Sequence, residues 1–231
     1  KVVLPFYQEN SILDILLAKI RKHFSYPLVV ATSLNPKDNL IQHICESHQV
    51  VCFRGDEHNV LKRFVDCANR FEFTTVIRIC ADNPFLDMDF MQEIIDAHLT
   101  SKADYTSFCT SEQLPVIKTH YGVFCELVEL KALKQVLNNT SEQLYLEHVT
   151  NYIYTHPELF KLNLLPIPPF LEEVKMRLTL DSLEDWEILK LLYADCVKRD
   201  PDFTTATVID LLKKDGYKLK IMQQQIEKYS K

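Results

Sequence analysis

Short apolar segments alternate with longer segments of helical periodicity through the first half of the chain, and this alternation restricts the fold more than any other feature. The apolar segments are rich in β-branched residues and end in polar ones: PLVVATS, VVCFRG, TTVIRIC and ADYTSFC. Helical periodicity occupies residues 10–24, 36–48, 57–72 and 88–99. Continuous apolar strands that alternate with helices are typical of a parallel sheet covered on both faces. The sequence therefore predicts a doubly wound α/β fold with a mostly parallel sheet.

The alternation is weaker after residue 108. Residues 109–170 contain the strand candidate YGVFCE, helices near 127–138 and 143–155, and the apolar run LFKLNLLPIPPF. The run MRLTLD then predicts a further strand, and helices follow over 182–196 and at about 203–229. We expect one domain over residues 1–231 with a small insert subdomain at about 109–170.

The net charge and the cysteines indicate which kinds of partner and which cellular compartment to expect for the protein. The formal net charge is −6 and the pI is near 5.8, so no basic field would attract nucleic acid or an anionic membrane. The seven cysteines are an odd number and never occur as CxxC, which is typical of reduced core cysteines. No apolar run reaches the roughly 18 residues of a membrane span. We expect a cytoplasmic protein that binds neither nucleic acid nor membrane.

Glycine is scarce, with three residues in the chain: Gly55, Gly122 and Gly216. Enzymes of the α/β class that bind phosphates normally use glycines in the first strand-to-helix loop. The deficit predicts that such a loop is either absent from the chain as given or not used by the protein.

Polar residues follow several predicted strands, and the ligand crevice of an open parallel sheet lies at these carboxyl ends. Such positions are occupied by Thr32, Ser33, Arg54 to Asp56, Asp82 and Asp181. Carboxylates at the ends of two different strands can approach each other and share one hard cation such as Mg²⁺. Asp82 and Asp181 are thus candidate metal ligands, with Pro84 fixing the turn and Asp87 capping the next helix.

A structural interpretation of both aspartates stays open at this point. An aspartate before a helix is most often an N-cap. The segment DSLED, which begins at Asp181, is a good helix start in which Ser182 would be the cap and Asp185 would lie in the first turn. The residues by themselves indicate a nucleotide-binding type of α/β domain with a candidate two-carboxylate metal site, and they do not name a reaction.

Arg78 is the one charged residue within the apolar run VIRIC. A charge in a central strand is rarely buried without a partner. We therefore expect Arg78 to pair with a carboxylate or with an anionic ligand near the crevice.

Five segments in order resemble a known family: ATSLNPKDN, FRGDEHNVLKRF, VIRICADNPFLD, LEHVTNYIY and RLTLDSLEDWEIL. The sequence is similar to the cytidylyltransferases typified by the spore coat polysaccharide biosynthesis protein SpsF, which are relatives of the CMP-sialic acid and CMP-KDO synthetases. The similarity extends from Lys1 to about residue 212. It implies a nucleotide-diphospho-sugar transferase-like, Rossmann-like fold.

The resemblance also implies roles for individual residues. Asp82 matches the metal-binding aspartate of the family's GDxPLI motif, and Asp181 matches the first aspartate of its VDTPEDLE motif, so both are implied to be catalytic and to bind Mg²⁺. Ala81 and Cys80 stand where the family usually has a glycine and a threonine. The expected nucleotide-binding residues are Lys1, Arg54, Gly55, Asn59 and Arg78, and the expected sugar-binding residues are Glu126, Glu147 and His148.

Two of these assignments have a structural alternative. Asp56 would cap a helix whose basic face is solvated, in place of a nucleotide-binding turn. His148 would pack on an amphipathic helix, in place of a contact with the sugar.

The start of the family's sequence has no counterpart here. The family begins with a strand and a loop that resembles QARxxSxRLPGK, and KVVLPF is similar to the family's segment immediately after that loop, with Lys1 as the terminal lysine of the loop. We therefore expect that the first strand and the nucleotide loop are missing from the chain as given, which accounts for part of the glycine deficit.

The implied function is magnesium-dependent transfer of a cytidylyl group from CTP to a sugar, with release of pyrophosphate, for the synthesis of a surface polysaccharide or glycan. The resemblance further implies a homodimer, with residues near 109–170 serving sugar binding or dimerisation. Two alternatives stay open. One is a non-catalytic protein that binds a nucleotide sugar or a partner, and the other is a glycosyltransferase whose DxD pattern would be Asp87-Met88-Asp89.

Overall fold

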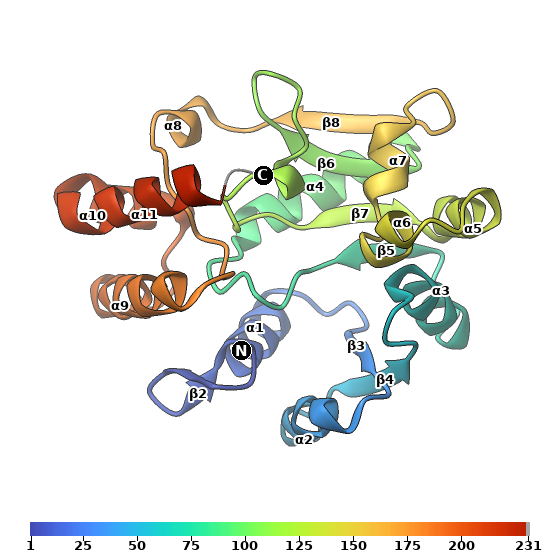
Figure 1. Cartoon of the computed structure of the whole chain (residues 1–231), viewed down its shortest axis with the longest axis horizontal. Helices are drawn as coiled ribbons and strands as arrows, with labels where there is room; N and C mark the ends of the chain where they lie inside the picture. Colours follow the sequence, from blue (N-terminus) through green and yellow to red (C-terminus); the bar gives the residue numbers. More distant parts are fainter. Residues whose placement is uncertain (230–231) are drawn as a thin grey trace.

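The computed structural model describes residues 1–229 and contains a four-stranded sheet next to two smaller pairs of strands (Figure 1). The four-stranded sheet has the order β5 (Thr75–Arg78), β7 (Glu126–Glu129), β6 (Tyr105–Cys109) and β8 (Leu162–Pro166). The pairs are β1 (Pro5–Tyr7) with β2 (Asn10–Ser11), antiparallel, and β3 (Val29–Ser33) with β4 (Val51–Gly55), parallel. In the larger sheet β7 is antiparallel to both its neighbours and β6 is parallel to β8, so three of the four strands share one direction. The α/β class and the mostly parallel sheet are confirmed.

The helices occupy most of the predicted segments. They are α1 (Ile12–His23), α2 (Asn39–Ser47), α3 (Val60–Arg70), α4 (Met88–Ser101), α5 (Leu130–Asn139), α6 (Gln143–Glu147), α7 (Asn151–Thr155), α8 (Pro169–Glu172), α9 (Leu183–Arg199), α10 (Thr205–Lys214) and α11 (Gly216–Lys228), with 3₁₀ turns η1 (Pro36–Asp38) and η2 (Val116–Lys118). Ser11 and Asp14 form a capping box at the start of α1, and Asp87 caps α4 as predicted.

Both faces of the larger sheet are covered by helices. Side chains alternate across a strand, so neighbouring residues of β7 point to opposite faces. Leu127 belongs to a buried cluster with Ile94 of α4, and Val128 belongs to another cluster with Leu61 of α3 and Leu133 of α5. This arrangement explains why the strand sequences are apolar throughout and do not alternate.

Two predicted elements in the second half were wrong. Only the last residue of YGVFCE, Glu126, lies in a strand, and this strand, β7, continues to Glu129. The helix that was expected near residues 127–138 therefore starts at Leu130. The run MRLTLD is extended but lies in no sheet, although the Leu178 N–H donates to the His120 carbonyl oxygen at 2.8 Å. Its alternating apolar residues Met176, Leu178 and Leu180 are buried in the main core, which gives a strand-like pattern without a strand partner.

The segment 109–170 contributes two strands, β7 and β8, to the four-stranded sheet. It is therefore continuous with the main fold. The helix expected at 143–155 is divided into α6 and α7 by residues 148–150. The expected roles of this segment in sugar binding and dimerisation stay predictions.

Strands β3 and β5 each pair with a single strand, and an apolar cavity of about 400 Å³ lies between them. Its walls come from β3, β5, α1, α3 and α4. Buried strand edges leave backbone N–H and C=O groups without partners, which is unfavourable. The edges of β3 and β5 that face this cavity pair with no strand within residues 1–229.

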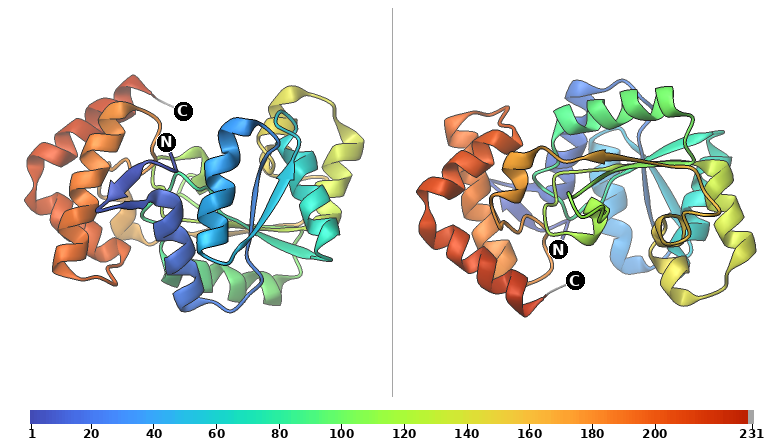
Figure 2. Two further views of the ribbon diagram at one scale, coloured as in Figure 1. Left: turned by 90° about the horizontal axis from the view of Figure 1, so that it is seen from below. Right: turned by 90° about the horizontal axis from the view of Figure 1, so that it is seen from above.

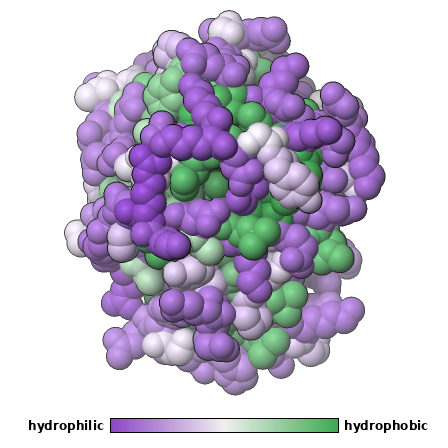
Figure 3. All heavy atoms as spheres, turned by 90° about the vertical axis from the view of Figure 1, so that its left-hand side faces the viewer, coloured by the Kyte–Doolittle hydropathy of each residue, from purple (hydrophilic) through white to green (hydrophobic). Residues whose placement is uncertain are grey.

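Helices α9, α10 and α11 pack against one another at one end of the molecule (Figure 2). The face on this side is mainly hydrophilic, with apolar side chains between the polar ones (Figure 3). No helix within residues 1–229 combines the length and the apolar character needed to cross a membrane.

Gly122 fixes a close approach between two chain segments that matter for the site. Its φ is +61°, and a Cβ atom there would lie 2.7 Å from the carbonyl oxygen of Leu178. We expect Gly122→Ala to lower the free energy of unfolding by about 2 kcal/mol, because the left-handed backbone and the backbone contact both disfavour a side chain. Urea denaturation measures this change.

Gly216→Ala is the matched control, because no atom other than those of its chain neighbours and its own helix backbone lies within 4 Å of the position that a Cβ atom would take there. It should change the free energy of unfolding by less than about 0.5 kcal/mol. Equal stability of the two variants would show that the contact between Gly122 and Leu178 imposes no constraint.

Candidate functional site

The two candidate metal ligands, Asp82 and Asp181, line one cavity of about 370 Å³. Asp82 comes from the turn after β5, and Asp181 comes from the extended segment before α9. The other walls are formed by η2 and the loop after it, by the junction of α6 and α7, and by the start of β7. The structure thus brings together two carboxylates that lie far apart in the sequence, although their catalytic and metal-binding roles stay predictions.

The turn that presents Asp82 is stabilised by its own backbone. The Asn83 N–H donates to the Cys80 carbonyl oxygen at 3.3 Å, and the Leu86 N–H donates to the Asn83 carbonyl oxygen at 3.2 Å. Ala81 is not among the described residues with positive φ, so the replacement of the family's glycine causes no strain there. Asp82 itself is half-buried and receives no hydrogen bond from residues 1–229, which leaves its carboxylate available.

The donor set of the cavity fits a magnesium ion that is shared with a substrate. No group of three or more His, Cys, Asp or Glu residues in the described part of the chain has the geometry of a metal site. Mg²⁺ commonly binds one or two carboxylates and completes its octahedral shell with water and substrate phosphates. Asp82 and Asp181 can supply the protein's share of such a shell.

A buried ion pair forms the floor of the cavity. Arg78 Nη1 donates to Glu126 Oε2, and the two side chains are 16% and 3% exposed. Glu126 Oε1 accepts from the hydroxyl groups of Tyr105 and Thr150, the latter at 2.9 Å. The prediction that Arg78 pairs with a carboxylate is confirmed.

Two tyrosines of this floor stay protonated at neutral pH. Burial, followed by the neighbouring charge of Glu126, raises the pKa of Tyr105 well above its usual value. The same causes, in the same order, raise the pKa of Tyr154 to about 12. Both hydroxyl groups therefore remain protonated and able to donate a hydrogen bond at neutral pH.

The three expected sugar-binding residues occupy different positions. Glu126 lines the cavity but has both carboxylate oxygens engaged by Arg78, Tyr105 and Thr150. His148 is exposed at the end of α6 and lines the cavity, so it is not packed on an amphipathic helix. Glu147 is exposed and is not part of the cavity wall. A sugar-binding role for each of them stays a prediction.

The expected nucleotide-binding residues of β4 and α3 do not line this cavity. Arg54 Nη2 donates to the Asn35 carbonyl oxygen at 2.9 Å, and its Nη1 reaches side chains of α2. Gly55 packs beneath Arg63, and Asn59 caps α3 by accepting from the Lys62 N–H at 2.8 Å. These contacts give Arg54, Gly55 and Asn59 structural tasks, and their nucleotide contacts stay predictions.

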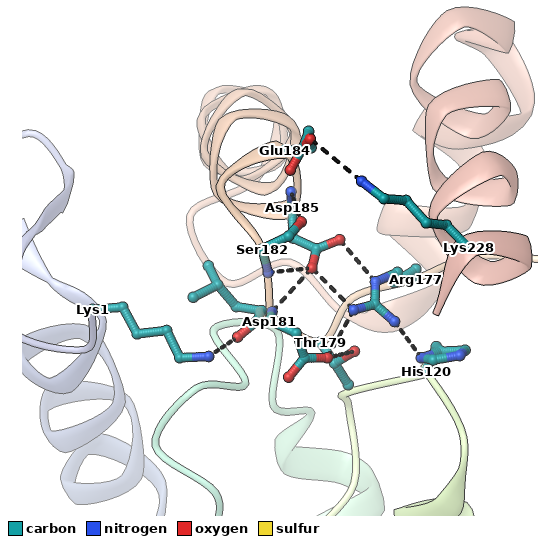
Figure 4. A network of polar contacts seen from close by, with 10 residues as sticks. Lys1, His120, Arg177, Thr179, Asp181, Ser182, Glu184, Asp185 and Lys228 are labelled. Atoms are coloured by element: carbon teal, nitrogen blue, oxygen red, sulfur yellow. Dashed lines mark hydrogen bonds and ion pairs between the residues drawn. The ribbon is translucent and has the colours of Figure 1, made fainter. Parts of the chain in front are cut away.

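Lys1 lies beside the second carboxylate, as Figure 4 shows. Its Nζ donates to the carbonyl oxygen of Leu180, the residue before Asp181. The positive charge of Lys1 is therefore next to the cavity wall, where a phosphate would be attracted to it.

Sequence reasoning missed two residues of this region. Lys118, at the end of η2, is exposed, lines the cavity, and has no ion-pair partner within residues 1–229. Arg177 is 1% exposed and contacts Asp181, Asp185 and His120. Arg177 had a usable signal, because it is the one charge within the apolar run MRLTL, just as Arg78 is within VIRIC. Lys118 had none, because a lysine in a loop is usually solvated.

These features define an α/β protein with a carboxylate-lined cavity beside its sheet. The sequence pattern of the cytidylyltransferase family matches residues 1–224. The chain belongs to the cytidylyltransferase family.

Two curated relatives are similar over most of the chain. The spore coat polysaccharide biosynthesis protein SpsF of Bacillus subtilis (strain 168) is 33% identical over 221 residues, which cover 93% of this chain and 88% of SpsF. An uncharacterised protein of Methanocaldococcus jannaschii is 32% identical over 181 residues, which cover 78% of this chain and 71% of that protein.

Solved structures agree on the fold. A cytidylyltransferase from Leptospira borgpetersenii superposes with a TM-score of 0.81 at 23% identity, covering 96% of this chain and 90% of that one. A CMP:2-keto-3-deoxy-manno-octonic acid synthetase complexed with CTP superposes with a TM-score of 0.57 at 8% identity, covering 80% and 88%. At these identities the likeness concerns the fold alone.

Glu126 should be essential for stability because it neutralises a buried guanidinium. We expect Glu126→Gln to lower the free energy of unfolding by about 3 kcal/mol, since Arg78 would keep its charge without a buried counter-ion. Chemical denaturation at neutral pH measures the loss.

Glu187→Gln is the control, because Glu187 is exposed and makes no hydrogen bond or ion pair within the described residues. It should leave the stability within about 0.5 kcal/mol of the wild type. A Glu126→Gln protein as stable as this control would contradict the role assigned to the buried pair.

Proposed function

We propose that the protein is a magnesium-dependent cytidylyltransferase that forms a CMP-sugar and pyrophosphate from CTP and a sugar, in the synthesis of a surface polysaccharide or glycan. The observation that supports this proposal best is the pair Asp82 and Asp181, which come from separate segments and line the same cavity. Family membership supports the use of CTP, and the name of the SpsF relative supports a polysaccharide pathway.

The chemistry asks the protein to position groups and to neutralise charge. The oxygen of a sugar hydroxyl forms a bond to the α-phosphorus of CTP, the bond from that phosphorus to the bridging oxygen breaks, and pyrophosphate leaves with the electron pair. The proton of the hydroxyl passes to water. No covalent bond to the protein is required.

The residues of the cavity have distinct tasks in this scheme. Asp82 and Asp181 would hold Mg²⁺, which supplies positive charge to the phosphate oxygens and lowers the pKa of a bound hydroxyl. Lys118 and Lys1 add positive charge at the rim and at the wall. Arg78 is already neutralised by Glu126, so its task is to hold the floor in place more than to bind a phosphate.

The glycosyltransferase alternative finds no support at the DxD pattern. Asp87 is 4% exposed, and its carboxylate caps α4 and accepts from the N–H and the hydroxyl of Thr205 at 2.8 and 2.6 Å. Asp89 is exposed in the first turn of α4 and does not line the cavity. The Asp87-Met88-Asp89 pattern therefore joins α4 to α10 and offers no pair of free carboxylates.

Pyrophosphate release tests the proposal. The assay combines the protein with Mg²⁺, each of the four nucleoside triphosphates, and a panel of acidic and neutral sugars. We expect release with CTP and at least one sugar, and we expect Asp82→Ala to lower kcat/KM by about 10²-fold or more, the size of effect seen when a group that stabilises developing charge is removed.

Asp89→Ala is the matched control, because it removes an aspartate of the next helix that is exposed and outside the cavity. Its kcat/KM should stay within about twofold of the wild type. Wild-type activity of Asp82→Ala would contradict the proposed site, and the absence of both turnover and CTP binding would favour the non-catalytic alternative.

A further inference from the structure

Arg177 is the largest side chain that is fully buried in the described part of the chain, and it lies directly behind Asp181. Its Nε donates to Asp185 Oδ1 at 2.8 Å, and its Nη2 donates to Asp185 Oδ2 at 3.0 Å and to Asp181 Oδ2 at 2.8 Å. Its Nη1 contacts His120 Nδ1 at 2.6 Å. Figure 4 shows the guanidinium among these groups. A single cation thus joins three segments of the chain.

Asp185 holds Arg177 in a fixed orientation. It is 4% exposed and binds the guanidinium with both oxygens, a geometry that fixes the plane of the group. Its Oδ2 also accepts from the N–H groups of Asp181 and Ser182 at 3.0 and 2.8 Å. The backbone of Asp181 is therefore fixed by the same carboxylate that fixes Arg177.

The two carboxylate oxygens of Asp181 have different surroundings. Oδ2 accepts from Arg177 at 2.8 Å and from the Thr179 hydroxyl at 3.4 Å. Oδ1 accepts no hydrogen bond from any residue within 1–229, and the side chain is 45% exposed where it lines the cavity. One oxygen is thus committed to the protein, and the other is available to a ligand.

The loop opposite Arg177 contributes to the same arrangement. His120 contacts the guanidinium, and its carbonyl oxygen accepts from the Leu178 N–H at 2.8 Å. Thr119 and Gly122 of this loop line the cavity together with Asp181. Asp185 and the loop therefore both help to fix the position of the Asp181 carboxylate, and Arg177 is the residue that contacts all three.

We propose that Arg177 is a positioning residue for Asp181: it holds Oδ2 so that Asp181 binds a divalent cation through Oδ1 alone. This inference rests on the proposed function, because it takes Asp181 as a metal ligand. Residues that orient a metal ligand from outside commonly change metal affinity by about 10- to 100-fold when they are substituted. A purely structural arginine would affect the stability without acting through Asp181.

The test is a double-mutant cycle on the binding of Mn²⁺ in the presence of CTP, measured from the free Mn²⁺ signal in electron paramagnetic resonance. We expect Arg177→Lys to weaken Mn²⁺ binding by about tenfold, because a lysine ammonium does not reproduce the planar fork that joins Asp181, Asp185 and His120. In the Asp181→Asn background the same substitution should change Mn²⁺ affinity by less than about twofold, because the carboxylate through which it acts is gone.

Two controls separate positioning from folding. Arg199→Lys changes an arginine of α9 whose partner Asp210, at 3.0 Å, lies outside the cavity, and it should leave Mn²⁺ affinity unchanged. If Arg177→Lys does not fold, Arg177→Met combined with Asp185→Asn removes both buried charges and is compared with Asp185→Asn alone. The double variant should again bind Mn²⁺ about tenfold more weakly than its control.

The outcomes distinguish this inference from the proposed function. If Asp181→Asn weakens Mn²⁺ binding but Arg177→Lys does not, or if Arg177→Lys has the same effect in both backgrounds, the positioning role is overturned and the two-carboxylate site stands. If Asp181→Asn itself leaves Mn²⁺ binding unchanged, Asp181 is not a ligand, and both the metal site and the inference are overturned.

Discussion

The ion pair between Arg177 and Asp185 is the interaction on which the position of Asp181 in the cavity wall depends. An ionised guanidinium that is 1% exposed must be neutralised, and the bidentate contact with Asp185 does so within hydrogen-bond distance. The same pair fixes the start of α9, where Ser182 and Asp185 form a capping box. Asp181 is therefore attached to a rigid helix start and not to a flexible loop.

At the floor of the cavity, a second buried arginine is also neutralised by a carboxylate. Arg78 and Glu126 neutralise each other beneath the floor, and Tyr105 and Thr150 satisfy the remaining oxygen of Glu126. With both buried arginines paired, the carboxylate of Asp82 and the Oδ1 atom of Asp181 are left to face the cavity. A divalent cation and phosphate oxygens would complete this arrangement, since two nearby carboxylates attract positive charge.

Much of the structure of the first half of the chain could be predicted from the sequence. Helical periodicity located α1 and α4, and Asp87 was recognisable as a cap because it precedes a helical pattern. The lone charge of Arg78 in an apolar strand predicted a carboxylate partner, which the structure supplies. These successes depend on interactions between residues that are close in sequence or on a rule that holds for any buried charge.

The features that the sequence did not reveal depend on contacts between residues that lie far apart in the chain. Nothing in the sequence indicated that the partner of Arg78 is Glu126, because the two meet through antiparallel pairing of β5 with β7. The apolar residues of MRLTL are buried in the core, and Arg177 among them is buried in an ion pair. This alternation resembles a strand although no strand forms, so periodicity alone predicted the wrong element. Arg54 joins β4 to α2 and to the loop before it, a contact that only the packing of those elements determines, and its expected nucleotide contact stays a prediction.

The most direct test of the account is a crystal structure of the protein with CTP and Mn²⁺, with the anomalous signal used to locate the ion. The account predicts one manganese peak in the cavity, with an oxygen of Asp82 and an oxygen of Asp181 both at ligand distance and phosphate oxygens of CTP beside them. A manganese ion bound away from these two aspartates, or CTP bound outside the cavity, would contradict it.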